Sequence, residues 1–406
     1  MPLWKRILFI TLFLLAVAGI GFLIYQFFFA PTPAVERPVP IVEQPTGALP
    51  GAGPAVSTPT ITPTAPQLPA AKAIPLTALA AKGGTVQVTE VQPDRSISPI
   101  LSSNGNDLVS YDVFDGKFYT VTPDGTLTKL SDDAFVGAET ITMNPQADKT
   151  VIEFPDGSNI LYDFKTKKQV SLPQHWREFN FSPDGGQIAY KSYGIDPDNN
   201  WLAIANADGT EGQAIEPLGN RGAYVDVNWS PTGQVIATSR DGIDSSRQRI
   251  LFLGKNKENF KSAVVNGRGF QYQYSPDGTQ MLYSVYSPGG DYKPELWVMD
   301  SIGDEIGDNR RSLGIATWSN KCAFSDAQYV YCAVPPSLPT GAGLIQDAMD
   351  NADDVLVKIN VSTGERTKLA ETPTAQTISK VVVTKDQKTL YYTDKQTGRI
   401  FTMKLE

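Results

Sequence analysis

A short phrase recurs three times in the middle of this chain and constrains its fold more than any other feature. The copies occupy residues 181–190, 229–237 and 274–283. Each has an apolar residue, a turn of the type Ser-Pro-Asp-Gly and then an apolar segment suited to a β-strand. The serines of the three copies, Ser182, Ser230 and Ser275, lie 48 and 45 residues apart. A period of this size indicates a chain built from repeated supersecondary units.

The turn chemistry shows what each unit contains. Proline at the first central position presets φ near −65°, and glycine supplies a positive φ at little steric cost, so the phrase joins two strands tightly. More divergent copies begin near residues 102, 144, 324 and 383, which brings the total to seven. Seven units of about 45 residues with strands on both sides of a turn are typical of a β-propeller.

The rest of each unit also repeats. A third apolar segment follows every copy, as at residues 201–204 and 296–300, and a fourth follows a glycine-bearing turn, as at 125–130 and 364–369. The last copy ends after three such segments. Residues 85–91 supply the missing outer strand, so we expect both ends of the domain to close the ring in one sheet. The prediction is an all-β, seven-bladed propeller of four-stranded antiparallel sheets over residues 84–406.

These repeats resemble those of the TolB-type propeller family, which also occur in the propeller domain of prolyl-oligopeptidase-type peptidases. The Ser-Pro-Asp-Gly turns and the segment from Glu295 to Asp300 carry the resemblance, which covers roughly residues 84–406. It implies the fold and says little about the ligand, because such propellers serve many roles.

The N-terminus carries a different signal. Residues 7–29 form an uninterrupted apolar run that would span about 34 Å as a helix, enough to cross a bilayer. The run is longer than the core of a cleaved signal peptide, so a signal-anchor is favoured over cleavage. Lys5 and Arg6 precede it, which predicts a cytoplasmic stretch at 1–6 and a propeller outside the membrane.

Residues 30–83 are predicted to form a linker. Residues 31–82 contain twelve prolines with many Ala and Thr residues and almost no charge, a composition that cannot form a core. This composition is compatible with a stiff stalk and equally with a flexible tether. All 43 acidic residues follow residue 30 with 33 of the 35 basic ones, a formal charge of −10, which argues against nucleic acid as a partner.

Cys322 and Cys332 are the two cysteines, and they flank the turn of the sixth copy. In a hairpin centred near residue 327 they face one another at a distance suited to a disulfide. We expect this bond, with two buried free thiols as the alternative. An oxidising compartment would favour it.

The sequence gives little sign of catalytic chemistry. His175 is the one histidine, no Gly-x-Ser-x-Gly elbow is present, and no hydrolase domain follows the propeller. Acidic stretches at 196–200 and 347–354 are weak candidates for calcium because neither matches a complete binding loop. No phosphate loop, dinucleotide fingerprint or zinc spacing occurs. We therefore expect no catalytic residues, no cofactor and no metal.

The connections between the second and third strands differ strongly among the repeats. They are predicted to be long in four successive blades, at 192–200, 239–248, 284–295 and 334–354, and short elsewhere, as at 114–116. All would emerge on the face opposite the Ser-Pro-Asp-Gly turns. The last one contains a possible short helix over 343–349. Aromatic, arginine and acidic side chains in these loops suggest a recognition surface, with tolerated insertion as the alternative; the candidate residues are Tyr193, Asp196, Asp198, Arg240, Asp241, Asp244, Tyr286, Asp291 and Tyr292.

The function predicted from these features is a non-enzymatic, membrane-anchored recognition or scaffold module. Its partners would be a protein, peptide or glycan, bound on the face that carries the long loops, and the membrane itself, through the N-terminal helix. One alternative is a propeller enzyme, a metal-dependent hydrolase or lyase with its site at the mouth of the central channel. Another is a purely structural component of the cell envelope.

Overall fold

The structure is a computed structural model that describes residues 19, 77–78, 88–258, 260–371 and 376–405. The predicted transmembrane helix at 7–29 and linker at 30–83 therefore lie outside the described residues, apart from Gly19 and the pair Thr77–Ala78. Within the described residues, no helix is long and apolar enough to cross a membrane.

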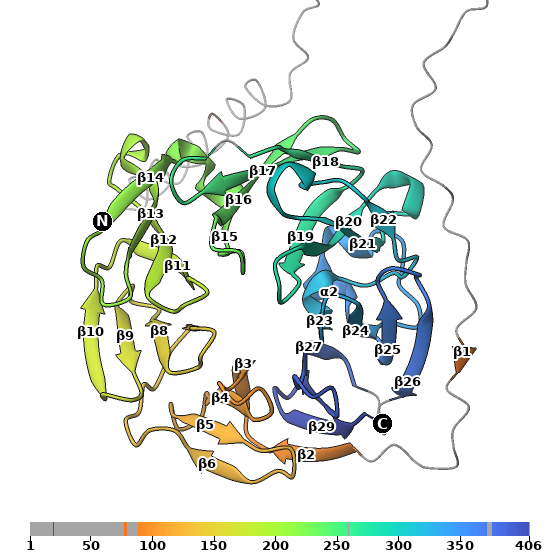
Figure 1. Cartoon of the computed structure of the whole chain (residues 1–406), viewed down its shortest axis with the longest axis horizontal. Helices are drawn as coiled ribbons and strands as arrows, with labels where there is room; N and C mark the ends of the chain where they lie inside the picture. Colours follow the sequence, from red (N-terminus) through yellow and green to blue (C-terminus); the bar gives the residue numbers. More distant parts are fainter. Residues whose placement is uncertain (1–18, 20–76, 79–87, 259, 372–375, 406) are drawn as a thin grey trace, which may run out of the picture. The chain divides into compact units, whose positions relative to one another are not determined.

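The chain forms seven small antiparallel sheets arranged around a centre (Figure 1). Blade 1 consists of β3 (Ser96–Leu101), β4 (Leu108–Asp112), β5 (Phe118–Val121) and β6 (Leu127–Lys129). Blade 2 consists of β7 (Thr140–Met143), β8 (Lys149–Glu153), β9 (Asn159–Asp163) and β10 (Lys168–Leu172). Blade 3 consists of β11 (Trp176–Phe181), β12 (Gln187–Ser192), β13 (Trp201–Asn206) and β14 (Gln213–Pro217). The first strand of each blade is innermost and the fourth outermost.

The remaining blades follow the same order. Blade 4 consists of β15 (Val225–Val227), β16 (Val235–Gly242), β17 (Gln248–Gly254) and β18 (Ala263–Val265). Blade 5 consists of β19 (Arg268–Tyr274), β20 (Gln280–Tyr286), β21 (Pro294–Asp300) and β22 (Arg311–Ser312). Blade 6 consists of β23 (Cys322–Phe324), β24 (Tyr329–Val334), β25 (Val355–Asn360) and β26 (Arg366–Glu371), with β1 (Thr77–Ala78) added in parallel to β26. The seven-bladed prediction is confirmed.

Blade 7 closes the ring from both ends of the domain. It contains β27 (Ile378–Val383), β28 (Thr389–Asp394) and β29 (Ile400–Lys404) from the C-terminus and β2 (Val88–Gln92) as its outer strand. Val88 of β2 pairs with Met403 of β29 in an antiparallel register. The predicted closure is therefore confirmed, because the strand before blade 1 completes the last sheet.

The recurring turns are held by their own side chains. In the first clear copy, Gly185 donates its backbone N–H to Ser182 O at 2.9 Å, and Gly185 has a φ of +69°. The Ser182 hydroxyl donates to Asp184 Oδ1 at 2.5 Å and accepts from Gln187 N at 2.9 Å. Serine and aspartate thus satisfy the polar groups of a tight turn, which explains why the phrase recurs.

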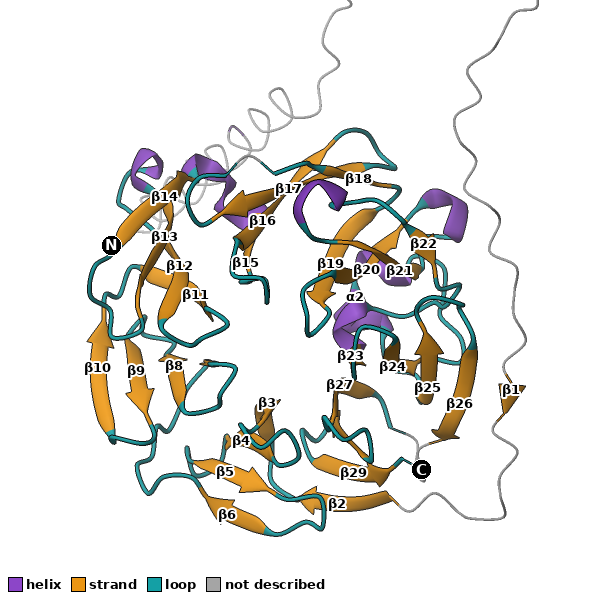
Figure 2. Ribbon diagram, viewed as in Figure 1, coloured by secondary structure: helices purple, strands orange, loops and turns teal. Residues whose placement is uncertain are grey.

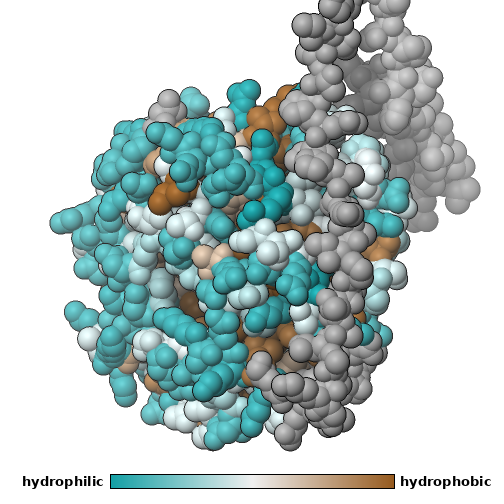
Figure 3. Space-filling view, turned by 45° about the vertical axis from the view of Figure 1, so that its right-hand side comes forward, coloured by the Kyte–Doolittle hydropathy of each residue, from teal (hydrophilic) through white to brown (hydrophobic). Residues whose placement is uncertain are grey.

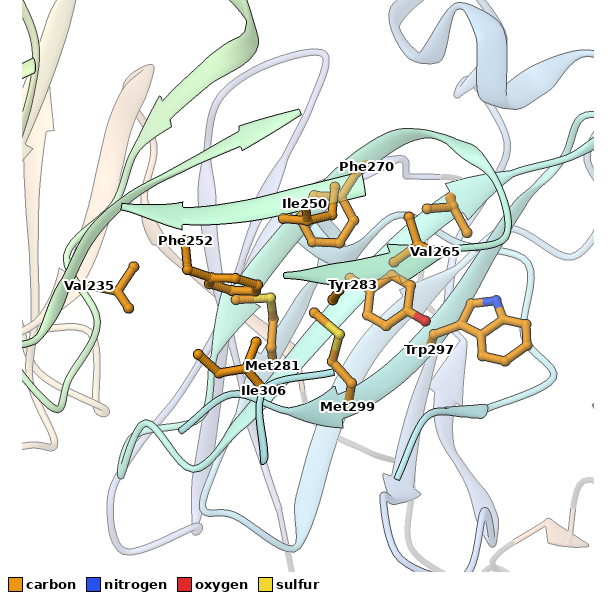
Figure 4. Close-up of a cluster of buried hydrophobic side chains, with 12 residues drawn as sticks. Val235, Ile250, Phe252, Val265, Phe270, Met281, Tyr283, Trp297, Met299 and Ile306 are labelled. Carbon is orange, nitrogen blue, oxygen red and sulfur yellow. The ribbon is translucent and has the colours of Figure 1, made fainter. Parts of the chain in front are cut away.

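Apolar side chains from adjacent blades pack into shared cores. Figure 4 shows the cluster between blades 4 and 5, where Phe252 of β17 packs with Phe270, Met281 and Met299 of blade 5. These side chains are almost fully buried, so each sheet contributes to the cores on both of its sides. Burial of this kind supplies most of the favourable free energy that holds the blades together.

Cys322 of β23 and Cys332 of β24 are directly paired across the hairpin and form a disulfide. The predicted bond is therefore present in the structure, and the two-thiol alternative is wrong for it.

Short helical turns occur in the connections (Figure 2). They are η1 (Pro197–Asn199), η2 (Gly219–Tyr224), η3 (Pro288–Gly290), η4 (Gly303–Glu305), η5 (Ser319–Lys321), η6 (Ala342–Leu344) and α2 (Gln346–Met349). The helix predicted at 343–349 is thus two short pieces. Ile345 separates them because its backbone is not helical, with a φ of −140° and a ψ of 81°.

Candidate functional site

Two kinds of connection share one face of the propeller. Because the strands of a blade alternate in direction, the loops between second and third strands emerge beside the connections that lead to the next blade. Hydrogen bonds confirm this: Asn200 Nδ2 donates to Gly219 O at 2.9 Å, and Gln346 Nε2 donates to Asn320 Oδ1 at 3.1 Å. We call this side the long-loop face; the Ser-Pro-Asp-Gly turns lie on the opposite, turn face.

The structure corrects the predicted loop lengths. The loops are 193–200 in blade 3, 243–247 in blade 4, 287–293 in blade 5 and 335–354 in blade 6. The blade 4 loop is much shorter than predicted, because β16 and β17 remain paired up to Gly242 and Gln248. Arg240 and Asp241 therefore lie in β16, and Tyr286 is the last residue of β20. Three loops are long rather than four.

The blade 3 loop packs onto the next connection. A Cβ atom on Gly222 of η2 would lie 2.8 Å from the Tyr193 hydroxyl, so the ring of Tyr193 packs directly against the backbone at Gly222. Burial raises the pKa of Tyr193. Asp196 caps η1 by accepting from Asp198 N at 3.0 Å, while the Asp198 side chain lies in an exposed turn. Tyr193 and Asp196 thus shape the loop, and the Asp196 side chain remains exposed.

The charged candidates of blade 4 are paired. Asp241 forms an ion pair with Arg221 of η2, and Arg240 Nε lies 3.5 Å from Asp226 Oδ2. Asp244 Oδ2 lies 2.7 Å from Arg247 Nη2. The Ser246 N–H and Arg247 lower the pKa of Asp244 to about 2.

The loops of blades 5 and 6 are bonded to each other. Gly341 N donates to Asp291 O at 2.8 Å, and Gly343 N donates to Tyr292 O at 2.7 Å. The rings of Tyr286 and Tyr292 are 6.5 Å apart between centroids, and the carboxylate of Asp291 lies 3.7 Å from Lys293 Nζ. Two loops from separate repeats therefore form one surface.

Two adjoining depressions lie where blades 4, 5 and 6 meet, and we call them the double pocket. The larger encloses about 570 Å³ and is lined by residues that include Ile243, Asp244, Arg268, Tyr286, Tyr292 and Leu344. The smaller encloses about 190 Å³ and is lined by residues that include Arg240, Gln271, Ser284, Tyr286, Trp318 and Leu344. Tyr286 and Leu344 belong to both. Four predicted residues, Arg240, Asp244, Tyr286 and Tyr292, thus meet at one site.

The group that anchors the blade 6 loop was not predicted from the sequence. Lys321 Nζ lies 2.7 Å from Asp350 Oδ1 and 2.7 Å from Asp354 Oδ2, and all three side chains are at most 2% exposed. Asp354 Oδ2 also accepts from Ile378 N at 2.6 Å. Desolvation nevertheless raises the pKa of Asp354 to about 6. Two carboxylates that the sequence suggested as weak calcium candidates instead hold a buried ammonium group.

Acidic residues on the inner strands also lie next to bases. Glu178 is on a bulge of β11 with a φ of +55°, and its Oε2 lies 2.5 Å from the buried Lys191 Nζ. Burial raises the pKa of Asp226 on β15 despite the nearby Arg240. In the described part of the chain, no group of three or more His, Cys, Asp or Glu side chains could hold a metal ion. His175 makes an edge contact with Trp176, and its carbonyl accepts from Tyr193 N.

Comparison with known proteins identifies the fold of the chain but not its family. No family model matches the sequence, and no curated protein matches it. Among solved structures, the β-propeller domain of Cps50 (Swd1) from Myceliophteria thermophila aligns with 13% identity and a TM-score of 0.54, over 79% of this chain and 99% of that chain.

Two further structures bear on the resemblance and on the enzymatic alternative. An oligogalacturonate lyase from Vibrio parahaemolyticus aligns with 11% identity and a TM-score of 0.51, over 80% of this chain and 95% of that chain. TolB from Acinetobacter baumannii aligns with 13% identity over 69% of this chain and 64% of that chain, at a TM-score of 0.41 that is too low to support an argument. The neighbours thus include a lyase and proteins of other kinds.

Proposed function

We propose that this protein is a membrane-anchored, extracytoplasmic recognition or scaffold module whose long-loop face binds a protein partner. The double pocket lies within that face. The proposal is non-enzymatic: the disc presents a binding surface, and the N-terminal segment holds it at the membrane.

The distribution of exposed apolar side chains carries the proposal. The side of the molecule shown in Figure 3 is largely hydrophilic with separate apolar patches, so the location of exposed apolar side chains is informative. Of the eleven exposed large apolar side chains among the described residues, nine lie in connections of the long-loop face: Phe114, Val136, Ile195, Tyr224, Ile243, Tyr292, Leu344, Ile345 and Met349. Leu127 lies on an outer strand and Ile302 at the turn face. One face is therefore selectively apolar.

The described part of the chain enters the propeller on the side away from that face. β2 enters the ring at Val88 opposite Met403, and Leu405 donates to Lys388 O in the last turn of the recurring type at 2.7 Å. The polypeptide thus joins the propeller at its turn face. The long-loop face points away from this entry, which suits a surface that meets a partner.

The membrane part of the proposal rests on the sequence. The apolar run at 7–29 after Lys5 and Arg6 supports a single-pass anchor with a cytoplasmic N-terminus. The Cys322–Cys332 disulfide supports an oxidising compartment for the propeller. Carbonate extraction of membranes and protease protection of sealed vesicles test the anchor and its orientation. Release by carbonate would contradict the anchor, and a propeller protected on the cytoplasmic side would contradict the orientation.

Site-directed crosslinking tests the binding face. A photoreactive amino acid is placed at Leu344 or Ile195 in the full chain, and at Ile302 as a control of similar chemistry on the turn face. Discrete partner adducts from the first two positions and none from the third are expected in native membranes. Adducts that arise mainly from position 302 would contradict the proposal.

One feature supports the enzymatic alternative: acidic side chains on the innermost strands lie next to basic side chains. Asp226 and Glu178 lie near Arg240 and Lys191, and the raised pKa of Asp226 is the type of perturbation found in catalytic acids. A lyase acting at the channel mouth would lose activity in an Asp226→Asn variant. A substrate screen in which the wild type and this variant behave alike would remove the alternative.

A further inference from the structure

The double pocket has a composition that indicates the chemistry of its ligand, and the inference below rests on the proposed function. Its lining residues that carry a charge at neutral pH are Arg240, Asp244 and Arg268. Asp244 pairs with Arg247 at 2.7 Å and Arg240 lies 3.5 Å from Asp226, so Arg268 is the lining charge without an ion-pair partner among the described residues. The lining therefore carries excess positive charge in a domain that is acidic as a whole.

The two arginines lie in different halves of the site. Arg268 lines the larger pocket, and its Nη1 donates to the backbone oxygen of Asp244 at 3.0 Å. Among the described residues, no carboxylate forms an ion pair with it. A guanidinium group with one neutral acceptor retains donors that suit a carboxylate in a bidentate arrangement.

The smaller pocket contains polar atoms with unused hydrogen-bonding capacity. Arg240 Nε and Gln271 Oε1 are buried and have no hydrogen-bond partner among the described residues, although Arg240 lies within ion-pair distance of Asp226. Buried polar atoms are normally satisfied by protein, water or ligand. A ligand group that enters here meets both a cationic donor and an amide acceptor.

The wall between the two halves is apolar and pre-organised. The ring of Tyr286 lies against two glycines: a Cβ on Gly269 would be 2.3 Å from its Cε1, and one on Gly343 would be 2.5 Å from its Cβ. Gly343 is bonded to Tyr292 through its N–H, which fixes the blade 6 loop beside both rings. A site that is formed before binding loses less conformational entropy when the ligand enters.

We propose that the double pocket binds an extended acidic segment of the protein partner. An apolar or aromatic side chain of that segment packs between Tyr286, Tyr292 and Leu344. Flanking carboxylates meet Arg268 on one side and, on the other, the donors of Arg240 that its contacts with Asp226 and Ala223 O leave available. The recognised pattern is an apolar residue between two acidic ones.

The test uses random-peptide display on the immobilised full-length protein. Selection is expected to enrich peptides with an aromatic or large apolar residue flanked by Asp or Glu. The best peptide should bind an Arg268→Gln variant at least about tenfold more weakly, because a charge-assisted hydrogen bond contributes roughly 1.5–3 kcal/mol. An Arg310→Gln variant, which changes an exposed arginine near the turn face, should bind normally.

A second variant separates the position of the guanidinium from its charge. A Cβ on Gly242 would lie 2.6 Å from Arg268 Nη1, so Gly242→Ala displaces the end of a flexible side chain. It should weaken the acidic peptide while the thermal midpoint stays near that of the wild type. Normal affinity in both Gly242→Ala and Arg268→Gln would overturn the proposal.

The outcome also distinguishes the peptide proposal from the proposed function. Enrichment of peptides without acidic residues, or capture of uronate oligosaccharides with no peptide enriched, would overturn the acidic-peptide proposal. Partner adducts at Leu344 that persist unchanged in the Arg268→Gln, Arg240→Gln double variant would overturn it as well, while leaving the long-loop face as the binding face.

Discussion

Replacing Lys321 with methionine tests whether a buried ion pair holds the blade 6 loop in place. Its Nζ lies 2.7 Å from carboxylate oxygens of both Asp350 and Asp354, and the three side chains are at most 2% exposed. Methionine keeps a similar volume without the charge. Two carboxylates would then remain buried. The remaining cation in ion-pair contact with them, among the described residues, is Lys395, whose Nζ lies 3.8 Å from Asp350 Oδ2.

The expected cost is large. Removing one partner of a buried ion pair typically destabilises a protein by about 3–5 kcal/mol, because an uncompensated charge stays out of water. We expect Lys321→Met to lower the free energy of unfolding by this amount near pH 7. The exposed pair of Lys261 and Asp308 has the same 2.7 Å separation, with side chains 45% and 53% exposed. Lys261→Met should cost about 1 kcal/mol or less.

Urea unfolding of the full-length protein, followed by tryptophan fluorescence, measures both variants. Trp318 reports locally, since Lys321 Nζ lies 5.9 Å from the centroid of its ring. A triple variant, Lys321→Met with Asp350→Asn and Asp354→Asn, removes the charges together and should recover much of the lost stability. The reasoning fails if the Lys321 and Lys261 variants lose equal stability, or if the triple variant is less stable than the single one.

Two further predictions concern the same blade. Desolvation raises the pKa of Asp354 to about 6 in the folded state, whereas an unfolded chain has an Asp pKa of about 3.9. The folded state therefore holds this proton more tightly, and the contribution of Asp354 to the free energy of unfolding should fall by about 3 kcal/mol as the pH rises from about 4 to about 6. An Asp354→Asn variant should lack this pH dependence. Replacing both Cys322 and Cys332 with serine should lower stability by about 2–3 kcal/mol, as expected for a bond that spans ten residues. Dithiothreitol should lower the stability of the wild type to the level of that variant and leave the variant itself unchanged.

Local chemistry allowed much of the fold to be predicted. The Ser182 turn and its copies recur because one arrangement of hydroxyl and carboxylate satisfies the same turn each time. The Cys322–Cys332 pairing followed from the symmetry of a hairpin about its turn. Both depend on residues close in sequence, which a repeat makes visible without knowledge of the distant contacts.

The site was less predictable because it depends on contacts between repeats. Nothing in the local sequence marks Arg240 and Asp241 as strand residues, since their pairing with β17 decides where the loop begins. Lys321 resembles an exposed lysine until the fold brings Asp350 and Asp354 to it, 29 and 33 residues later. The double pocket likewise needs residues from three blades.

The blade 6 loop departs furthest from the repeat and is also firmly held. A disulfide closes the hairpin that follows Lys321, the buried charges fix the end of the loop, and Gly343 bonds its middle to Tyr292. An insertion that is merely tolerated at a surface has no reason to bury two carboxylates, because their desolvation costs several kcal/mol. That cost is understandable where the loop must present Leu344 to a partner in one conformation. These contacts therefore support the proposal that the long-loop face binds a partner.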